Sequence, residues 1–470
     1  MIKVLDKNRD KKDLYEAYKL EERNKYRQFY HVHPISGLLN DPNGFCYYNG
    51  YWYLFYQWHP FGPFHGQKHW YMTRSKDLIE FENMGVGLVP EEIFENRGAY
   101  SGSGLEIDGK LNVFYTGNFR DNNDIRRPKQ VRAVLGEDGK IGHKKVIIGT
   151  NKDFTEHQRD PSIYYNPLDK TYYIFLGAQD MDKGSIILYR SKDLDAWEYR
   201  GKIKIKGYKD FGYMWECPSF AKVDGKDLLI FSPQGLGDGK NSNRDLNGYL
   251  IGKMDFENVE FVVEEDFKRL DHGFEFYASM IGKSQEKTYL ISWLGLPDVN
   301  LEKNGLSNSS LSLVRNLEIR DGRLYQRPQD FTEKIIESKK TTSNKLEVKS
   351  IKPMRILIEN VMEDIKIDFF KDKNGSSPLI LTYREESLLL ERLDIIDRKN
   401  WEVRILELKV DKLEIFIDRS SVEIFVNDGG YTLSTRIFPE DEEESLEISS
   451  NDKVNIEYGF IGKIDTKFTL

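Results

Sequence analysis

The sequence Arg74-Ser75-Lys76-Asp77-Leu78 occurs a second time, as Arg190-Ser191-Lys192-Asp193-Leu194. Each copy follows an aromatic, apolar run and precedes an aromatic residue, Phe81 or Trp197. The copies begin 116 residues apart, which corresponds to two units of about 58 residues, close to the length of a propeller blade with its loops. Five such units would occupy about 290 residues. The repeat therefore predicts a five-bladed β-propeller over residues 30–332.

The sequence around the two copies is typical of β-strands. Six apolar or aromatic runs have the length of buried or half-buried strands, and they cover residues 51–58, 111–115, 171–176, 185–189, 228–231 and 288–294. Pairs such as Asn49-Gly50, Asp108-Gly109 and Asp224-Gly225 stand between runs and tolerate the positive φ angles that tight hairpins require. We expect an antiparallel, all-β protein.

The remaining domain boundaries follow from changes in composition. The polar segment 333–350, which contains Ser338-Lys339-Lys340-Thr341-Thr342-Ser343, is predicted to be a linker. Closely spaced strand-like runs after it predict a second all-β domain over residues 351–470, most simply a β-sandwich. Residues 1–29 are rich in charge, and Leu14, Ala17 and Tyr18 follow helical spacing. They predict a short helical extension that packs on the main body.

Composition excludes several classes of protein. The 470 residues carry 69 Lys and Arg against 77 Asp and Glu, a net charge of −8, which argues against nucleic acid as the main partner. There is no apolar run near the roughly 18 residues of a membrane-spanning helix. Cys46 and Cys217 are the only cysteines, too few for a disulfide framework. Together with an N-terminus unlike a signal peptide, this predicts a cytoplasmic protein.

Three acidic residues are candidates for catalysis. Asp41 lies in Leu39-Asn40-Asp41-Pro42-Asn43-Gly44, which predicts a sharp turn just before a strand. Asp160 follows Arg159, whose charge would favour an ionised carboxylate, whereas Glu216 lies in Tyr213-Met214-Trp215-Glu216-Cys217-Pro218, whose apolar members would favour the protonated form. One ionised and one protonated carboxyl group is the pair that glycoside hydrolysis requires.

The spacing of these acids agrees with the propeller. They are 119 and 56 residues apart, about two blades and one blade, so equivalent strand positions would converge on the central axis. A structural alternative remains open for Asp41 and Asp160, because Asp-Pro pairs commonly start turns.

Six motifs resemble the β-fructofuranosidases of glycoside hydrolase family 32. In chain order they are His33-Pro34-Ile35-Ser36-Gly37-Leu38-Leu39-Asn40-Asp41-Pro42-Asn43-Gly44, Phe55-Tyr56-Gln57-Trp58, Tyr100-Ser101-Gly102-Ser103, Arg159-Asp160-Pro161, Trp215-Glu216-Cys217-Pro218 and Phe231-Ser232-Pro233-Gln234-Gly235. The later run Ile417-Asp418-Arg419-Ser420-Ser421-Val422-Glu423-Ile424-Phe425 is similar to the family's β-sandwich signature. The resemblance covers residues 30–440 and implies a five-bladed propeller followed by a β-sandwich.

The resemblance also implies a retaining hydrolase that acts on a terminal fructosyl unit without a cofactor or metal. Asp41 would be the nucleophile, Glu216 the acid and base, and Asp160 the stabiliser of the transition state. The residues expected to bind substrate are Asn40, Gln57, His65, Tyr100, Ser101, Arg159 and Trp293. Ordinary strand packing remains an alternative for Gln57 and Trp293.

The segment His59-Pro60-Phe61-Gly62-Pro63-Phe64-His65-Gly66-Gln67-Lys68-His69-Trp70 resembles intracellular bacterial members of the family that act on sucrose 6-phosphate. His65, Lys68 and His69 could place positive charge near the glucosyl side, although Lys68 could equally be solvated. The expected partner is therefore a small sugar: sucrose 6-phosphate, sucrose or a short fructan.

Five positions depart from the usual family sequence. They are Tyr71, Met72, Glu275, Ser279 and Val314, and we expect them near the leaving-group side, where they would affect substrate size. Hydrolysis of fructans, transfer of fructose to another sugar and a non-catalytic sugar-binding role remain as alternatives. Five histidines, namely His31, His33, His59, His65 and His69, are close together but lack a metal-binding spacing. A homo-oligomer is neither predicted nor excluded.

Overall fold

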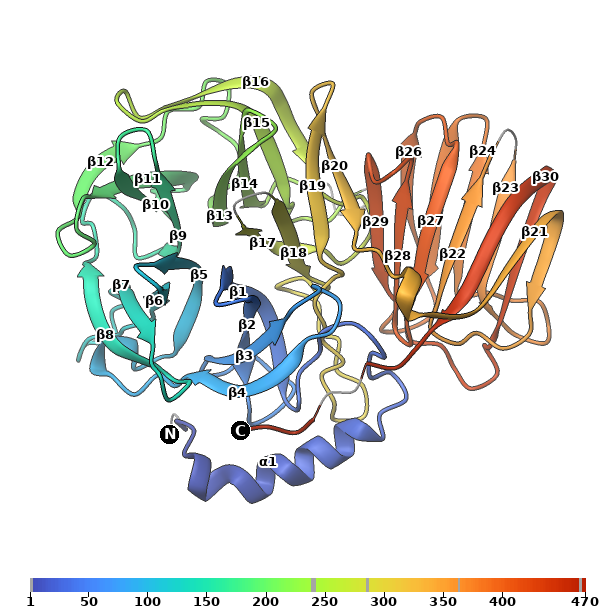
Figure 1. Ribbon diagram of the computed structural model, residues 1–470, viewed down its shortest axis with the longest axis horizontal. Coiled ribbons are helices and arrows are strands. Elements are labelled where there is room, and N and C mark those ends of the chain that lie inside the picture. Colours follow the sequence, from blue (N-terminus) through green and yellow to red (C-terminus); the bar gives the residue numbers. More distant parts are fainter. Residues whose placement is uncertain (1–2, 238–241, 285–286, 362–363, 465–466) are drawn as a thin grey trace.

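The protein consists of a ring of β-sheets beside a second β-domain (Figure 1). The structure is a computed structural model that describes residues 3–237, 242–284, 287–361, 364–464 and 467–470. Within these ranges it contains one α-helix, two short 3₁₀ helices (Ile93–Glu95 and Thr332–Lys334), five four-stranded sheets and one ten-stranded sheet. The predicted all-β fold, a five-bladed propeller followed by a second β-domain, is confirmed.

Each blade is a four-stranded antiparallel sheet whose strands follow one another in the sequence. Blade I contains β1 (Leu38–Tyr48), β2 (Tyr51–His59), β3 (His69–Ser75) and β4 (Glu82–Leu88). Blade II contains β5 (Ala99–Ile107), β6 (Lys110–Gly117), β7 (Lys129–Leu135) and β8 (Ile141–Ile148). Blade III contains β9 (Gln158–Asn166), β10 (Thr171–Asp180), β11 (Lys183–Ser191) and β12 (Glu198–Lys202).

The last two blades have the same order. Blade IV contains β13 (Met214–Val223), β14 (Lys226–Gln234), β15 (Gly248–Asp255) and β16 (Glu260–Arg269). Blade V contains β17 (Tyr277–Lys283), β18 (Thr288–Trp293), β19 (Arg315–Arg320) and β20 (Arg323–Pro328). The first strand of each blade lies nearest the centre of the ring (Figure 1).

The apolar runs of the sequence lie mainly in the second strands. Five of the six fall in β2, β6, β10, β14 and β18, and the sixth falls in β11. A second strand is hydrogen-bonded on both sides and is covered by neighbouring blades on both faces, so it has no polar face. In β2, for example, Leu54, Phe55 and Tyr56 are all fully buried.

The repeated five residues form the same turn in blades I and III. Ser75 Oγ accepts a hydrogen bond from the Leu78 backbone N–H at 2.8 Å, and Ser191 Oγ accepts one from Leu194 at 2.9 Å. Both leucines have positive φ angles, of 63° and 67°, although leucine seldom adopts this conformation. The shared turn confirms that the repeat marks equivalent places two blades apart.

The C-terminal domain is one continuous sheet that curls into two layers. Its strands are β21 (Ile335–Val348), β22 (Met354–Glu359), β23 (Ile365–Lys371), β24 (Leu379–Arg384), β25 (Ser387–Leu393), β26 (Trp401–Glu407), β27 (Lys412–Ile417), β28 (Ser421–Val426), β29 (Tyr431–Arg436) and β30 (Ser445–Ile461). The first part of β30 pairs with β23 and the second part pairs with β22. Because side chains from both halves share one buried core, the layers face each other as in a sandwich.

The prediction of a linker over residues 333–350 is wrong for most of that segment. Residues 335–348 form β21, which pairs along the length of β30. β21 pairs only with β30 and is mostly exposed. An edge strand of this kind does not need apolar residues and is protected from further pairing by lysines, so its composition is that of a loop.

Helix α1 (Lys7–Glu22) lies at the edge of the propeller, and both chain termini lie nearby (Figure 1). The Asp6 side chain caps the helix by accepting the backbone N–H groups of Asn8 and Arg9. Leu14 is buried in the core of blade I, and Tyr18 contacts Phe468 near the C-terminus. In the described part of the chain, no helix is long and apolar enough to cross a membrane.

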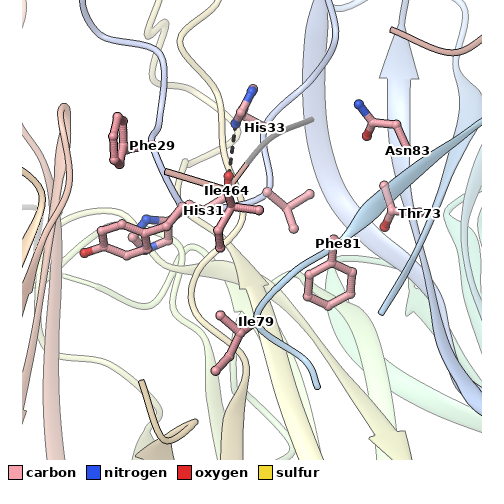
Figure 2. Close-up of a pocket in the computed structure, with 10 residues that line it drawn as sticks. Phe29, His31, His33, Thr73, Ile79, Phe81, Asn83 and Ile464 are labelled. Carbon is pink, nitrogen blue, oxygen red and sulfur yellow. Dashed lines mark hydrogen bonds between the residues drawn. The ribbon is translucent and has the colours of Figure 1, made fainter. Parts of the chain in front are cut away.

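Figure 2 shows a small cavity beside blade I, between the segment that leads into β1 and Ile464, which lies near the C-terminus. The His33 ring donates from Nδ1 to the His31 carbonyl, at 3.0 Å, on one side of this cavity. Its volume of about 10 Å³ accommodates about one water molecule. It is therefore too small for a sugar.

Candidate active site

The innermost strands of all five blades have a register shift where they face the centre. The shifts lie at 39–42 in β1, 99–102 in β5, 159–162 in β9, 216–219 in β13 and 277–280 in β17. A β-bulge of this kind bends the strand and redirects one side chain. The three candidate acids lie at such bulges. Asp41 therefore belongs to an irregular part of a strand, whereas the sequence predicted a turn that precedes a strand.

Asp41 is held by a ring of polar side chains. Ser101 Oγ donates to Asp41 Oδ2, and Asn40 Nδ2 donates to Asp41 Oδ1 at 3.1 Å. Asn40 Nδ2 also donates to Gln57 Oε1 at 2.7 Å, while Gln57 Nε2 donates to Ser101 Oγ. Burial raises the pKa of Asp41, which the hydrogen bond from Ser101 opposes, and the negative charge of Glu216 raises it further.

Glu216 is surrounded by polar donors, which differs from the apolar setting that its sequence neighbours suggested. Arg159 donates through Nε and Nη2 to Glu216 Oε1, at 2.9 and 2.7 Å. The other carboxyl oxygen accepts Tyr277 OH at 2.7 Å and Gln234 Nε2 at 3.0 Å. Trp215, in contrast, packs into the core, because adjacent residues of a strand face opposite sides of the sheet.

The pKa of the Asp160 carboxyl group is higher than its neighbours in the sequence suggested. Burial raises the pKa of Asp160 to about 7, against the opposing charge of Arg159, and the carboxylates of Glu216 and Asp41 add to the rise. The charge of Arg159 lowers the pKa of Asp160, as the sequence suggested, but burial outweighs this effect, and the guanidinium itself bonds to Glu216. The bulge places the Cys217 backbone N–H 3.0 Å from Asp160 Oδ2.

One cavity of about 390 Å³ opens over these acids, a size typical of small-molecule sites. The structure places every residue that the sequence singled out along its wall: Asn40, Asp41, Gln57, His65, Tyr100, Ser101, Arg159, Asp160, Glu216 and Trp293. They come from all five blades, in agreement with convergence on the central axis.

Five further residues line the cavity, namely Gly66, Lys68, Gln234, Tyr277 and Pro297. Of these, only Lys68 was considered from the sequence, as a possible positive charge near the glucosyl side. Gln234 belongs to a motif that already carried the family resemblance, so its polar side chain next to Pro233 was an available signal. Lys68 is buried, with 5% of its surface exposed, and the reading of Lys68 as a solvated side chain is wrong. Tyr277 had no signal that distinguished it from the other buried tyrosines.

The five departures from the family sequence lie outside this cavity in the described structure. Tyr71 and Met72 are core residues of blade I, and Val314 is buried before β19. Glu275 pairs with Arg392 of the C-terminal domain at 2.7 Å. Ser279 accepts a hydrogen bond from Asn247 at 2.5 Å. The expectation that these changes lie on the leaving-group side is therefore not met.

The clustered histidines have separate environments. His31 contacts Asp418 and Glu423, His65 lines the cavity, and His69 Nε2 accepts the Leu5 backbone N–H at 3.2 Å. In the part of the chain that the structure describes, no three His, Cys, Asp or Glu residues are grouped to hold a metal ion. The cavity's own polar groups are carboxyl, amide, hydroxyl, guanidinium, ammonium and imidazole groups.

A propeller with carboxyl groups around an axial, polar cavity is typical of a glycosidase. Comparison with known proteins agrees with this class. The family model "Glycosyl hydrolases family 32 N-terminal domain" matches residues 31–328, and "Glycosyl hydrolases family 32 C terminal" matches residues 332–461. The chain therefore belongs to glycosyl hydrolase family 32, and it is a glycosidase of the β-fructofuranosidase type.

Relatives span nearly the whole chain. The sucrose-6-phosphate hydrolase of Staphylococcus xylosus is 35% identical over 91% of this chain and 90% of its own, and that of Streptococcus mutans is 34% identical over 90% of each. Among solved structures, the sucrose-6-phosphate hydrolase from Lactobacillus gasseri has a TM-score of 0.91 and 32% identity over 97% of both chains. A Bombyx mori β-fructofuranosidase of this family has a TM-score of 0.85 and 29% identity, and covers 98% of this chain and 100% of its own.

Proposed function

We propose that this enzyme hydrolyses the β-fructofuranosidic bond of sucrose 6-phosphate, with retention of configuration, to release fructose and glucose 6-phosphate. The main support is that three carboxyl groups, from the inner strands of three blades, line one cavity. The relatives from S. xylosus and S. mutans, which match over about nine tenths of their lengths, are sucrose-6-phosphate hydrolases.

In the proposed first step, Asp41 attacks C2 of the fructosyl unit. The bond from C2 to the glucosyl oxygen breaks, and Glu216 gives its proton to that oxygen. The hydrogen bonds that Asp41 accepts from Ser101 and Asn40 favour an ionised, oriented nucleophile. The product of this step is a fructosyl ester of Asp41.

In the second step, Glu216 takes a proton from water while the water oxygen attacks C2 and releases Asp41. This role requires a carboxyl group that can hold a proton between the two steps. Tyr277 OH, 2.7 Å from Glu216 Oε2, can donate to the ionised carboxylate or accept from the protonated acid, because a hydroxyl group does both.

Asp160 and the polar wall would bind the fructose ring. With a pKa raised to about 7 by burial, Asp160 can either donate to or accept from a fructose hydroxyl near neutral pH. Arg159 and His65 provide a positive group and a ring N–H donor on the cavity wall, which suit an anionic substrate. A phosphorylated sugar also fits the proposed cytoplasmic location, because an importer that phosphorylates sucrose releases it inside the cell.

The first test compares kcat/KM for sucrose 6-phosphate, sucrose and a short fructan, with Asp41→Asn as the inactive control. We expect at least a tenfold preference for the phosphorylated sugar, equivalent to about 1.4 kcal/mol of transition-state binding. Equal or faster cleavage of sucrose or fructan would contradict the proposed substrate but not the class. Binding of sugar without release of fructose would indicate a binding protein.

Retention is tested separately, with methanol present during turnover. A covalent fructosyl intermediate reacts with methanol from the face that water uses, so methyl β-D-fructofuranoside should form and be detectable by NMR. Formation of the α-anomer would overturn the retaining mechanism. Glu216→Gln should lose most of its turnover of sucrose, whose leaving group needs a proton, and less of its turnover of a fructoside with an activated aryl leaving group.

A further inference from the structure

The charge of Lys68 acts on Asp41, yet in the described residues Lys68 makes no hydrogen bond or ion pair with this carboxylate. Its Nζ donates to Asn40 Oδ1 at 2.6 Å and lies 3.2 Å from His65 Nδ1. In the described residues, Lys68 has no ion pair with any Asp or Glu, whereas Lys144, whose side chain is 9% exposed, pairs with Glu95. A buried ammonium group without a carboxylate partner is costly, so a role in the site would account for it.

The contact with Lys68 fixes which way the Asn40 amide faces. An ammonium group only donates hydrogen bonds, so the atom that faces it must be the amide oxygen. The Asn40 amide nitrogen must then face Asp41 Oδ1 and Gln57 Oε1. If the amide turned over, its oxygen would face the Asp41 carboxylate, and two acceptors would repel each other.

The same constraint passes around the ring. Because Gln57 Oε1 accepts from Asn40, the Gln57 nitrogen faces Ser101 and donates to its hydroxyl oxygen. The Ser101 proton is then directed to Asp41 Oδ2. Both oxygens of Asp41 thus accept a hydrogen bond, because the Lys68 ammonium group, which only donates, sets the orientation of Asn40.

We propose that Lys68 is a positioning residue that sets the direction of the hydrogen-bond ring Asn40–Gln57–Ser101 and so orients Asp41 as the nucleophile. The inference rests on the proposed function, in which Asp41 attacks the fructosyl carbon. It is distinct from a role for Lys68 in holding the substrate phosphate, which would act on one substrate only.

The charge of Lys68 supports the same role. Its positive charge lowers the pKa of Asp41 and thereby opposes the effect of burial. Burial in turn lowers the pKa of Lys68 to about 7, and Asp41 partly restores it. Among the other titratable groups, Glu216 raises the pKa of Asp41. The charge of Asp41 in turn acts on Asp160 and Cys217, and that of Lys68 acts on His59 and His65.

The test measures kcat/KM against pH for Lys68→Met, which keeps an unbranched side chain, one atom shorter, but has no donor. We expect kcat/KM to fall about tenfold or more for sucrose and sucrose 6-phosphate alike. The acidic limb should move to higher pH by about one unit, since Asp41 loses both a positive charge and its oriented donors. Lys144→Met is the matched control, because it removes a half-buried lysine outside the cavity and should leave the acidic limb in place.

A second variant separates positioning from folding. Lys68→Ala leaves space for a small amine, so added methylammonium should restore part of kcat, whereas tetramethylammonium, which has no N–H donor, should not. An acidic limb that stays in place in Lys68→Met, together with no rescue of Lys68→Ala, would overturn the inference.

Two further outcomes are decisive. A fall for sucrose 6-phosphate alone would assign Lys68 to the phosphate and also overturn the positioning role. If the wild-type enzyme releases no fructose from any of these substrates, the proposed function itself fails, independently of Lys68.

Discussion

At the scale of single residues, Cys217 shows how a reactive side chain is kept inactive beside catalytic groups. Its backbone N–H binds Asp160, and its thiol lies 3.6 Å from the same carboxyl oxygen. Burial raises the pKa of the Cys217 thiol well above its ordinary value, and the carboxylates of Asp160, Asp41 and Glu216 add to this effect. Since the thiolate is the reactive form, Cys217 is a hydrogen-bond donor and not a nucleophile.

Iodoacetamide at neutral pH should therefore leave the activity intact. Cys217→Ala should retain kcat/KM within about threefold, because the backbone N–H that contacts Asp160 is kept and only a weak S–H donor is lost. Initial-rate assays before and after alkylation check both expectations. Rapid inactivation of the wild type that Cys217→Ala escapes would show that the thiol is reactive.

At the scale of elements, the inner strands combine regular pairing with local irregularities. Three residues at these bulges have positive φ angles: Asp160 at 66°, Cys217 at 48° and Ala278 at 52°. Ala278 is buried directly after Tyr277, whose hydroxyl binds Glu216. The conformation of the bulge thus determines where a side chain of the active site points.

We expect Ala278→Val to destabilise the enzyme and to lower its activity. A β-branched residue is strained at positive φ and overfills a packed core, which together should lower the free energy of unfolding by about 2 kcal/mol or more. Movement of Tyr277 should reduce kcat. Urea unfolding and steady-state kinetics measure the two effects, with Ala278→Gly as the control that accepts this backbone conformation. Equal stability and activity of the two variants would refute this account of the bulge.

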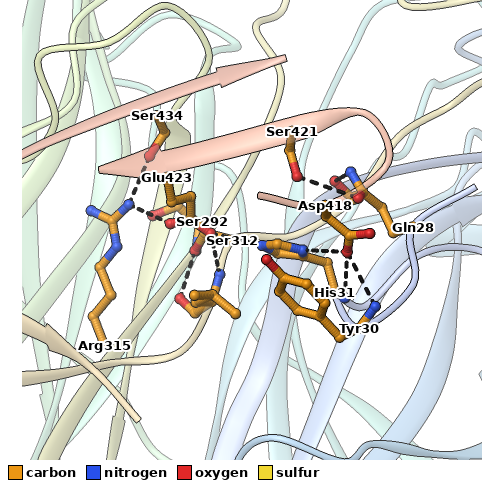
Figure 3. A network of polar contacts seen from close by, with 12 residues as sticks. Gln28, Tyr30, His31, Ser292, Ser312, Arg315, Asp418, Ser421, Glu423 and Ser434 are labelled. Atoms are coloured by element: carbon orange, nitrogen blue, oxygen red, sulfur yellow. Dashed lines mark hydrogen bonds and ion pairs between the residues drawn. The ribbon is translucent and has the colours of Figure 1, made fainter. Parts of the chain in front are cut away.

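At the scale of the whole molecule, the two domains are joined by a buried network of charged groups (Figure 3). The His31 ring, in the segment before β1, contacts Asp418 through Nδ1 at 2.8 Å and Glu423 through Nε2 at 2.9 Å. Glu423 also accepts from Arg315 of blade V at 2.7 Å. Two carboxylates can be satisfied by one imidazole only when both ring nitrogens carry a proton, so His31 is an imidazolium ion.

This network should make stability depend on pH above neutrality. Burial opposes the charge on His31, but the hydrogen bonds from its ring to Asp418 and Glu423 prevail and raise its pKa from 6.5 to about 8. Because the folded pKa exceeds the unfolded one, the stabilisation is complete below pH 6.5 and is lost as pH rises through about 8. The difference corresponds to about 2 kcal/mol.

Urea unfolding between pH 6 and pH 9 checks this expectation. His31→Asn should lower the free energy of unfolding by about 3 to 5 kcal/mol at pH 6, because two buried carboxylates lose their partner. Between pH 6 and pH 9, the variant should lose less stability than the wild type does. His143→Asn, at an exposed position, should retain the wild-type slope. A wild-type slope in His31→Asn would mean that other groups cause the pH dependence.

Much of the architecture was predictable from local pattern. The repeated turn at Ser75 and Ser191 indicated the blade period, and the apolar second strands indicated a propeller, because a strand buried on both faces needs an unbroken run of apolar residues. The six family motifs contained eight of the ten predicted residues that line the cavity, whereas His65 lay in the segment 59–70 and Trp293 lay outside any motif. In β21, which faces solvent, and in β1, which carries Asp41 at the cavity, the polar sequence predicted a linker and a turn and not a strand.

What depended on the tertiary structure is the set of contacts between segments far apart in the chain. The pKa of Asp160, the partners of Glu216 and the burial of Lys68 all depend on side chains from other blades, which a sequence window does not contain. Burial and hydrogen bonding act over a few ångströms in space, and the propeller brings together residues more than 50 positions apart in the sequence. The sequence therefore determined which groups are present, whereas folding determined their charge, direction and neighbours.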